Sequence, residues 1–540
     1  MSMIAVILAL ILAVTLVAAL ARAVPVPLPL LLIAAGVVLS AAPSFSRVHI
    51  DPETFFVLFI PPLLFADGWL MPRRDFKTVL RPVLLLAFGL VLATVVVVGY
   101  ALHALIPSLP LAAAFALGAI VSPTDAVATA AMTERLPLPS RVTLILNGES
   151  LINDASGLVA FKFAVAALAT GAFSLWEAGG QLVIVAAGGG AIGLAIAFLV
   201  GRMRRSLHCV GGEMPTVQTL LSLLTPFAAY LAAEHVGASG ILAVVASGLL
   251  SGFIDARRMS VTTRQHAWQV WLMVLFVFNG LVFLLLGLSL PPAIQALAPT
   301  QSWLDLALHA GALWAIVTAI RLLWVYPGTY LPPLLFASVR ASEPPRDPRA
   351  VFVIGWAGLR GSVTMAAALS LPVALPTGAP FPGREEIVFL SATTILLTLL
   401  INGLTLPPLI RWLRLRGDGA AGRELRAAEI ALAQAAAARL SRELPHLATA
   451  EEREFAQRLI GDYEGRIALH TANERRRDEL AQVADGHRRI VLLALEAERG
   501  ELASLRDQDV INDETARAIE PRIDHAELYA TNATAAERGH

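Results

Sequence analysis

The stretch Ala119–Lys162, AIVSPTDAVATAAMTERLPLPSRVTLILNGESLINDASGLVAFK, decides the fold. Two apolar segments within it carry polar and ionisable residues where a bilayer would surround them. The first segment holds Ser122-Pro123-Thr124-Asp125, and the second holds Asn147, Glu149, Ser150, Asn153 and Asp154. A charged side chain at the centre of a membrane helix costs about 2.5 kcal/mol or more, so these residues indicate a functional site.

Composition separates two parts of the chain. Hydrophobic residues make up 56% of it, above the roughly 45–50% typical of soluble domains. Charged residues are sparse up to residue 416 and dominate afterwards. The sequence therefore predicts a transmembrane cation/proton exchanger domain over 1–416 and a cytoplasmic helical tail over 417–540. The net charge of +0 indicates no nucleic-acid partner, and the single Cys209 excludes an intrachain disulfide.

Thirteen apolar stretches have about the length that spans a bilayer. They are residues 3–22, 25–42, 54–70, 79–105, 110–132, 140–168, 179–202, 215–236, 238–254, 267–290, 302–335, 350–374 and 386–413. We therefore expect an all-α polytopic membrane protein with about 13 transmembrane helices.

The gaps between these stretches predict an orientation. Lys and Arg gather at 73–81, 135–141, 202–205, 257–264 and 340–349, whereas the alternate gaps at 106–110, 170–180 and 291–302 carry neither. Basic residues accumulate on the cytoplasmic side. We expect a multi-pass protein of the cell (inner) membrane, with the N-terminus outside and the C-terminus in the cytoplasm.

Two of the stretches are interrupted. Pro123 removes a backbone donor from the fifth, and the twelfth is broken at Gly355 and again at Gly358–Gly361. Each is the fifth helix of a six-helix half, counted from the first stretch and from the eighth. Interruptions at matching places predict two inverted repeats, with two crossing broken helices and a site near the midplane.

Gly189 and Gly193 form a small-xxx-small pair in the seventh stretch. Such residues let helices approach closely in lipid. Packing inside the chain and a dimer interface are both open interpretations of this pair.

The tail from residue 417 has apolar residues at helical spacing over 424–444 and 490–505. This pattern predicts a small helical domain or a dimerising bundle. The histidines of the tail lack metal-ligand spacing, and we expect them on a solvated surface.

Ser150, Asn153 and Asp154 stand at i, i+3 and i+4 and share one helix face, with Glu149 one position off it. Hydroxyl, amide and carboxylate oxygens suit a hard cation such as sodium, whereas zinc or copper would call for His or Cys. Thr124 adds a hydroxyl from the first segment. We expect Asp154, Ser150, Thr124 and Glu149 to bind the ion, with Na⁺ at Asp154, Ser150 and Thr124.

Burial disfavours the charged form of Asp154, so near neutral pH its carboxylate holds either a proton or a cation. Competition for one carboxylate, in a site open to one side at a time, is sufficient for exchange. Because the neighbour is Asn153 and not a second aspartate, we count one proton-releasing group. The hypothesis is a secondary antiporter, not an enzyme and without a cofactor, that exchanges Na⁺, K⁺ or Li⁺ for protons electroneutrally by alternating access.

Asp125 and Arg360 are interpreted as a charge-balancing pair. Where broken helices cross, an acid is favoured near the half-helix N-termini and a base near the C-termini. Alternatively, Arg360 pairs directly with Glu149, and the sequence does not choose between these arrangements.

Five further polar residues lie in or beside the stretches. Lys162 lines the outer funnel or reaches the membrane surface, and Asp67 is interpreted as structural, near the site. Arg321, Asn279 and His103 are expected to be helix partners and not ligands.

Other functions fit less well. A cation-coupled symporter of a small organic solute would need more aromatic or basic residues in the core, and a tail-regulated channel would pass current. An esterase is excluded, because Ile152 stands where the G-x-S-x-G motif requires glycine.

Three motifs, at residues 122–125, 148–154 and 358–362, make the chain similar to the monovalent cation/proton antiporters of the electroneutral sodium/proton exchanger type. The similarity covers about residues 5–416. It implies thirteen helices, a six-helix core that moves against a dimerisation part, and homodimers.

The resemblance also implies roles for single residues. Asp154 would carry cation and proton, and Asn153 would steady the broken helix. Ser150 and the Thr124 carbonyl would complete the cation shell, and Glu149 would act through water or through Arg360. Ala126 stands where the family often has proline.

Overall fold

The structure is a computed structural model in two compact units, Met1–Arg416 and Gly417–His540. It describes residues 3–24, 26–42, 51–133, 136, 138–170, 175–299, 301–337, 347–375, 378–415, 417, 419–471, 474–508 and 510–538. Parts of the basic gaps at 135–141 and 340–349 lie outside the described residues. The named elements of the described chain are all helices, as predicted.

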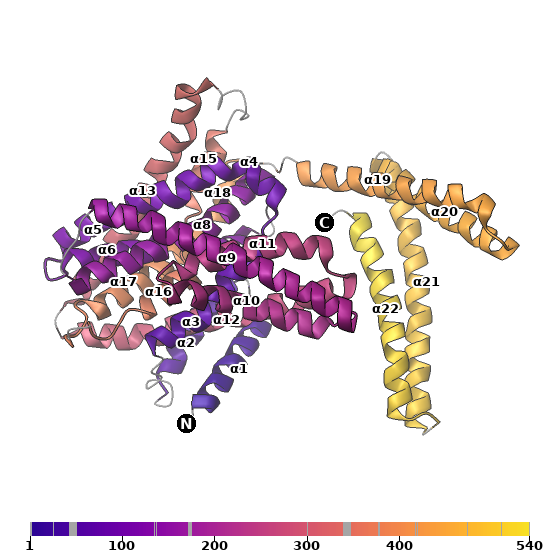
Figure 1. Ribbon diagram of the computed structural model, residues 1–540, viewed down its shortest axis with the longest axis horizontal. Helices are drawn as coiled ribbons and strands as arrows, with labels where there is room; N and C mark the ends of the chain where they lie inside the picture. Colours follow the sequence, from indigo (N-terminus) through magenta and orange to yellow (C-terminus); the bar gives the residue numbers. More distant parts are fainter. Residues whose placement is uncertain are drawn as a thin grey trace. The chain divides into compact units, whose positions relative to one another are not determined.

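The helices of the first unit follow the predicted apolar stretches (Figure 1). They are α1 (Met3–Ala21), α2 (Leu28–Ser40), α3 (Pro52–Leu70), α4 (Arg73–Leu84), the π-helical η1 (Leu85–Leu90), α5 (Val91–Leu105), α6 (Leu111–Val121), α7 (Ala126–Thr133), α8 (Ser140–Thr170), α9 (Leu175–Gly211), α10 (Pro215–His235), α11 (Gly240–Arg258), α12 (Val261–Leu297), α13 (Trp303–Leu335), α15 (Pro348–Trp356), α16 (Ser362–Leu369), α17 (Arg384–Leu397), the π-helical η2 (Thr398–Gly403) and α18 (Leu404–Trp412). Eight helices of the described chain are long and apolar enough to cross a membrane, or up to nine if the bent pair α6 and α7 counts as one span.

The fifth stretch is broken where proline predicts it. Helix α6 ends at Val121, α7 begins at Ala126, and the two are bent by 41°. The twelfth stretch is broken between Trp356 and Ser362.

The predicted break at Gly355 is wrong, because α15 continues through this residue. One glycine costs a helix only about 1 kcal/mol. Its role is close packing, since a Cβ added at Gly355 would lie 2.8 Å from Leu322 of α13.

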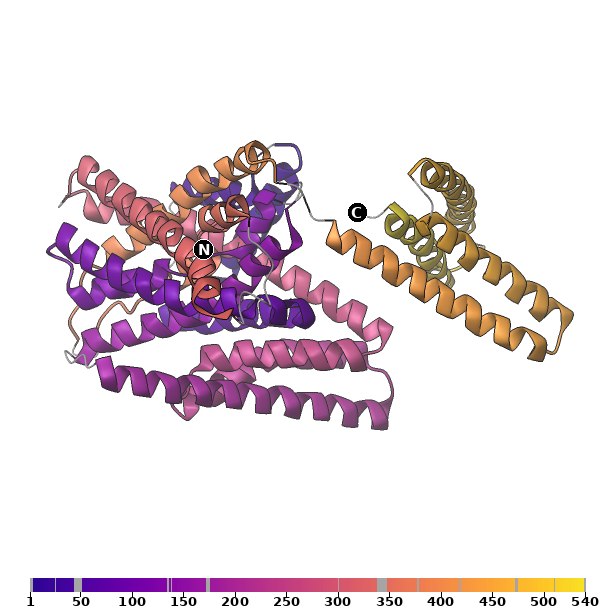
Figure 2. The same cartoon turned by 90° about the horizontal axis from the view of Figure 1, so that it is seen from above.

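Small residues bring helices together in the first unit. A Cβ at Gly189 would run into the backbone of Ser239, the N-cap of α11, and a Cβ at Gly193 into the backbone of Ala243 in α11. This pair of glycines therefore packs α9 on α11 within the chain. Of the two interpretations, internal packing is therefore confirmed. Figure 2 shows α9 and α10 side by side along one edge of the unit.

The second unit holds α19 (Ala420–Glu443), η3 (Leu444–His446), α20 (Ala450–Thr471), α21 (Glu474–Asp507) and α22 (Asp513–Arg538). Helices α19 and α20 pack together, as do α21 and α22. The surface prediction is wrong for His470, whose Nε2 lies 3.1 Å from Glu429 Oε2 with a side chain only 7% exposed. The side chain of His487 and all of His540 lie outside the described residues.

Candidate functional site

The two helix breaks meet and are joined through their backbones. The N–H of Asp125 donates to the carbonyl of Leu359 over 2.8 Å. This bond brings together the C-terminal ends of α6 and α15 and the N-terminal ends of α7 and α16, four half-helix ends at one place.

Asp125 lies at the two N-terminal ends. Its Oδ1 accepts from the Ala128 N–H of α7 at 3.0 Å, and its Oδ2 accepts from the Ser362 N–H of α16 at 3.1 Å. Unsatisfied N–H groups and the positive ends of the helix dipoles both favour a carboxylate here. A side chain at Gly361 would collide with this carboxylate, which explains the glycine.

Arg360 lies at the C-terminal end of α6 and is only 1% exposed. Its Nη1 donates to the carbonyls of Ser122 and Pro123, at 2.7 Å for Pro123. These carbonyls lack helical partners where α6 stops, and a cation is favoured beside them.

The π-helical turn η2 supports the second break. The Arg360 N–H donates to Thr398 Oγ1 at 3.2 Å, and Asn402 Nδ2 donates to the Trp356 carbonyl at 3.1 Å. Sequence reasoning missed both residues. Their spacing of i, i+4 in an apolar stretch was the available signal.

Glu149 forms a buried ion pair with Arg321 of α13, and not with Arg360. The pair is bidentate, with Arg321 Nη2 at 2.8 Å from Glu149 Oε2 and Nη1 on Oε1. Arg321 also donates to the Ile354 carbonyl of α15, through Nε at 3.2 Å and Nη2 at 3.0 Å. Arg321 thus joins α8, α13 and α15, as its interpretation as a helix partner predicts.

Thr124 and Asn153 extend this network to the first break. Asn153 Nδ2 donates to Thr124 Oγ1 at 2.7 Å, and Thr124 Oγ1 donates to Glu149 Oε1 at 3.3 Å. Ser150 Oγ accepts from the Ala126 N–H at 3.1 Å, at the start of α7. The side chains of α8 therefore hold the break itself, at Thr124, and the start of α7, at Ala126.

A small cavity of about 20 Å³ lies at the crossing. Its polar lining is Asp67, Thr124, Asp125, Ser150, Asp154, Asn279, Ser362 and Thr364. A cavity volume of about 10–15 Å³ is enough for one water molecule, so this cavity has room for one water molecule or one small ion.

Asp154 is 3% exposed and makes no hydrogen bond or ion pair within the part of the chain that the structure describes. Its side chain lines the cavity with Ser150, while Glu149 and Asn153 belong to the Arg321 network. Of these four α8 residues, Ser150 and Asp154 therefore line the cavity, whereas Glu149 and Asn153 form hydrogen bonds within the Arg321 network.

Asp67 and Asn279, which the sequence analysis did not count among the ion ligands, also lie at the cavity. Both line the cavity, from α3 and α12. The cavity therefore holds a further carboxylate, that of Asp67, besides Asp154 and the helix-end Asp125. The signal available was an acid inside an apolar stretch.

Two other candidates lie away from the cavity. Lys162 Nζ pairs with Glu234 Oε1 of α10 at 2.6 Å, with side chains 37% and 36% exposed, and lies over the Tyr230 ring at 5.5 Å. His103 Nδ1 is 2.8 Å from the Leu109 carbonyl, which agrees with a partner role.

Two crossing broken helices, with charged groups at their ends and a polar cavity between them, define a secondary transporter of ions and not an enzyme. The sequence pattern of the family described as "Sodium/hydrogen exchanger, transmembrane" matches residues 8–412. The chain belongs to this family and is a multi-pass membrane protein.

Several relatives resemble the chain over most of its length. A sodium, potassium, lithium and rubidium/H⁺ antiporter of Bacillus pumilus is 37% identical, with 94% of this chain and 75% of that protein covered. An uncharacterized Na⁺/H⁺ exchanger of Escherichia coli, YjcE, is 38% identical, with 92% of each covered. The solved sodium proton antiporter MjNhaP1 from Methanocaldococcus jannaschii has the same fold, with a TM-score of 0.56, 19% identity, and coverage of 76% of this chain and 98% of that one.

Proposed function

We propose that the chain exchanges monovalent cations for protons across the membrane by alternating access, with sodium, potassium or lithium as the cation. The observation that supports this proposal most strongly is the position of Asp154. Asp154 is a buried carboxylate without a protein partner among the described residues, and it lines the small cavity between two broken helices. Cation and proton then compete for Asp154.

The proposed cation ligands are oxygens that line the cavity. Asp154 and Ser150 contribute from α8, Thr124 from the first break and Asp67 from α3. Hard cations bind such carboxylate and hydroxyl oxygens. Glu149 acts indirectly, since its ion pair with Arg321 orients Thr124 and Asn153.

Asp125, Arg360 and Asn153 are proposed to stabilise the helix breaks in both transport states. Asp125 and Arg360 balance opposite helix ends through bonds to backbone groups. With these charges compensated, exchange of one cation for one proton leaves the net charge of the site unchanged. We therefore propose electroneutral exchange.

The test is transport by the purified full chain in vesicles that contain a trapped pH dye. Adding sodium or potassium outside should release protons from the lumen, with no membrane potential and no effect of an imposed one. Current in the absence of a proton gradient would identify a channel. A requirement for an organic solute would identify a symporter. A voltage-dependent rate would contradict electroneutrality alone.

Competition between cation and proton for Asp154 predicts the direction in which pH changes the apparent KM for sodium. Lowering the pH by one unit raises the proton concentration tenfold, so the apparent KM for sodium should rise by up to about tenfold at unchanged maximal rate. Initial rates at saturating and subsaturating sodium over several pH values measure this. A KM independent of pH, with a falling maximal rate, would contradict shared binding at Asp154.

Asp67→Asn should weaken cation binding without abolishing exchange. Loss of one oxygen charge from the cavity is worth about 1.5 kcal/mol, which raises the KM for sodium about tenfold. Asp51→Asn is the matched control on the same helix. Asp51 is the exposed N-cap of α3, and asparagine caps as well as aspartate. An unchanged KM in Asp67→Asn would remove Asp67 from the ligands.

We further propose thirteen membrane spans in two inverted six-helix repeats, with the N-terminus outside and the C-terminus in the cytoplasm. The nine spans that result when α6 and α7 count as one would be joined by four shorter or broken apolar segments, α1, α2, α11 and the pair α15–α16. A homodimer is proposed as well. The exposed apolar residues of α1 and α9, such as Leu12 and Phe198, leave faces that lipid or a second copy would cover.

A further inference from the structure

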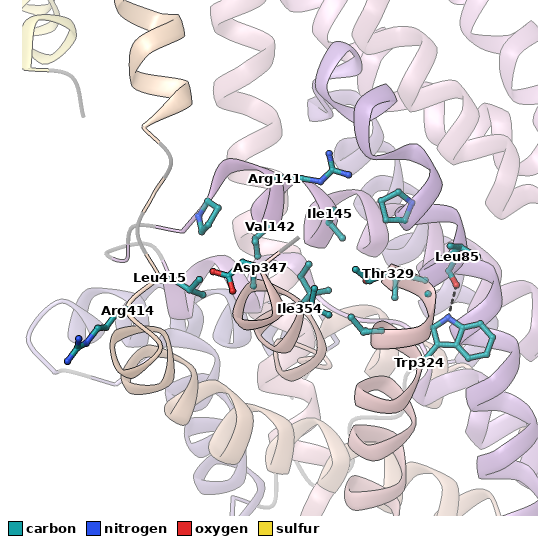
Figure 3. A pocket seen from close by; sticks show the side chains of 17 residues that line it. Leu85, Arg141, Val142, Ile145, Trp324, Thr329, Asp347, Ile354, Arg414 and Leu415 are labelled. Carbon is teal, nitrogen blue, oxygen red and sulfur yellow. Dashed lines mark hydrogen bonds between the residues drawn. The ribbon is translucent and has the colours of Figure 1, made fainter. Parts of the chain in front are cut away.

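The helices around the ion site differ in how closely their neighbours pack. Helices α8, α13 and α15 border a second cavity of about 260 Å³, whose wall includes Val142, Trp324 and Ile354 (Figure 3). Helix α3, which carries Asp67, contributes no residue to that wall. It packs instead directly on α11.

Glycines bring the backbones of α3 and α11 together. A Cβ at Gly248 of α11 would run into the Phe65 carbonyl of α3, and a Cβ at Gly252, one turn later, would run into the Trp69 carbonyl. On the α3 side, a Cβ at Gly68 would lie 3.1 Å from the backbone nitrogen of Leu249. The last turns of α3 therefore lie against α11 with no side chain between the two backbones.

A buried polar cluster ties the same end of α3 to two helices. The Trp69 Nε1–H donates to Asp255 Oδ2 of α11 at 2.9 Å, and Arg204 Nη1 of α9 donates to Asp255 Oδ1 at 2.8 Å. The side chains of Arg204 and Asp255 are only 7% and 5% exposed. Hydrogen bonds to a charged acceptor are stronger than those between neutral groups, so Asp255 is a firm anchor for the last turn of α3.

This attachment fixes the direction of Asp67. Residues two apart in an α-helix point about 160° away from each other. Phe65 and Trp69 each stand two residues from Asp67 and contact α11, so Asp67 points away from α11, where it lines the small cavity. A rotation of α3 about its axis would break the bond between Trp69 and Asp255 and would move Asp67 out of the cavity.

We propose that Asp255 and Trp69 are positioning residues for cation binding. They hold the Asp67 carboxylate in the small cavity and so set the affinity for the cation, because a ligand that is already in place needs no ordering when the ion binds. Arg204 compensates the buried charge of Asp255. The inference rests on the proposed place of Asp67 among the cation ligands.

Trp69→Phe tests this role in the vesicle assay with the full chain. The substitution removes one indole N–H and keeps an aromatic ring, so the chain should fold normally. The apparent KM for sodium should rise about threefold at unchanged maximal rate, which is part of the about tenfold effect expected for loss of the Asp67 carboxylate.

Trp271→Phe is the matched control. Trp271 of α12 is also buried, and its Nε1–H donates to Ser222 Oγ of α10 at 3.0 Å. This variant loses an indole hydrogen bond of the same kind that does not involve α3, so the KM for sodium should stay at the wild-type value.

The Asp67→Asn background separates positioning from general structure. A residue that acts only through the Asp67 carboxylate loses its influence once that carboxylate is gone. Trp69→Phe should therefore raise the KM in the wild-type background and leave it unchanged in Asp67→Asn. A residue with a merely structural role would have the same effect in both backgrounds.

Gly252→Ala tests the attachment of α3 by a second route. The added Cβ would run into the Trp69 carbonyl, so α3 must move away from α11, and the KM should rise in the same Asp67-dependent way. Gly201→Ala of α9 is the control, because its Cβ would lie 3.5 Å from Ile254 of α11, an ordinary contact.

Sodium binding is also measured without transport, as the sodium-dependent rise in the unfolding temperature of the purified chain. A wild type that binds sodium but does not exchange it would contradict the proposed function, and the temperature shifts of the variants would then still decide the positioning role. Four results would overturn the inference. They are no sodium binding by the wild type, unchanged sodium affinity in Trp69→Phe, an equal loss of affinity in Trp271→Phe, and a full effect of Trp69→Phe in the Asp67→Asn background.

Discussion

Asp154→Asn should abolish sodium-driven proton movement in vesicles. Asparagine has nearly the same shape and keeps one oxygen, but it neither releases a proton at neutral pH nor carries charge. Loss of a charged contact worth about 3 kcal/mol lowers the rate by at least about a hundredfold. The initial rate of dye response after a sodium pulse measures this. Because Asp154 makes no hydrogen bond or ion pair within the described chain, the substitution should leave the unfolding temperature unchanged.

The matched control is Asp305→Asn. Asp305 is an exposed acid in the first turn of α13, so this variant should transport like the wild type. If Asp154→Asn transports at the wild-type rate, the carboxylate shared by cation and proton lies elsewhere. If Asp154→Asn loses transport and also unfolds at a much lower temperature than the wild type, the loss comes from a structural role of Asp154.

Arg321→Met should be the most destabilising single change at the site. The side chains of Arg321 and Glu149 are only 2% and 1% exposed, and removing one partner of such a pair leaves an uncompensated charge at a cost of about 3–5 kcal/mol. The bonds to the Ile354 carbonyl are lost as well. Thermal unfolding of the purified chain should show this as a large drop in midpoint.

The double variant Arg321→Met with Glu149→Gln separates charge from shape. Without either charge, much of the lost stability should return, and the two single changes should be strongly non-additive. Lys162→Gln is the control, because its half-exposed pair with Glu234 is worth about 1 kcal/mol or less. If the double variant is as unstable as the sum of the single variants, the two side chains do not act as an ion pair.

Local signals in the sequence predicted most of the helices. Long apolar runs and basic gaps need no knowledge of distant contacts, and Pro123 breaks α6 through its own missing N–H. The glycines of the twelfth stretch were harder to interpret. Gly355 serves packing against α13, while the break lies at Gly358–Gly361, and only the neighbouring helices distinguish these cases.

Pairing across the fold was less predictable. Arg321 and Arg360 are both isolated cations in apolar stretches, and the sequence alone suggested Arg360 as the alternative partner of Glu149. The choice depends on how α13 and α15 are rotated about their axes, which places Arg321 on Glu149 and turns Arg360 toward the end of α6. For the same reason the sequence could not show that Asp67 lines the cavity. The direction of its side chain depends on the packing of α3 against α8 and α16.

The single bond from the Asp125 N–H to the Leu359 carbonyl has a mechanical consequence. It ties together two chain segments that are far apart in sequence, and Asp125 and Arg360 tie them twice more. If either broken helix unwound or slid alone, these contacts would be lost, so we expect the two breaks to move as one unit. A crossing that moves as one unit would prevent an exchanger from passing cations or protons without the counter-ion.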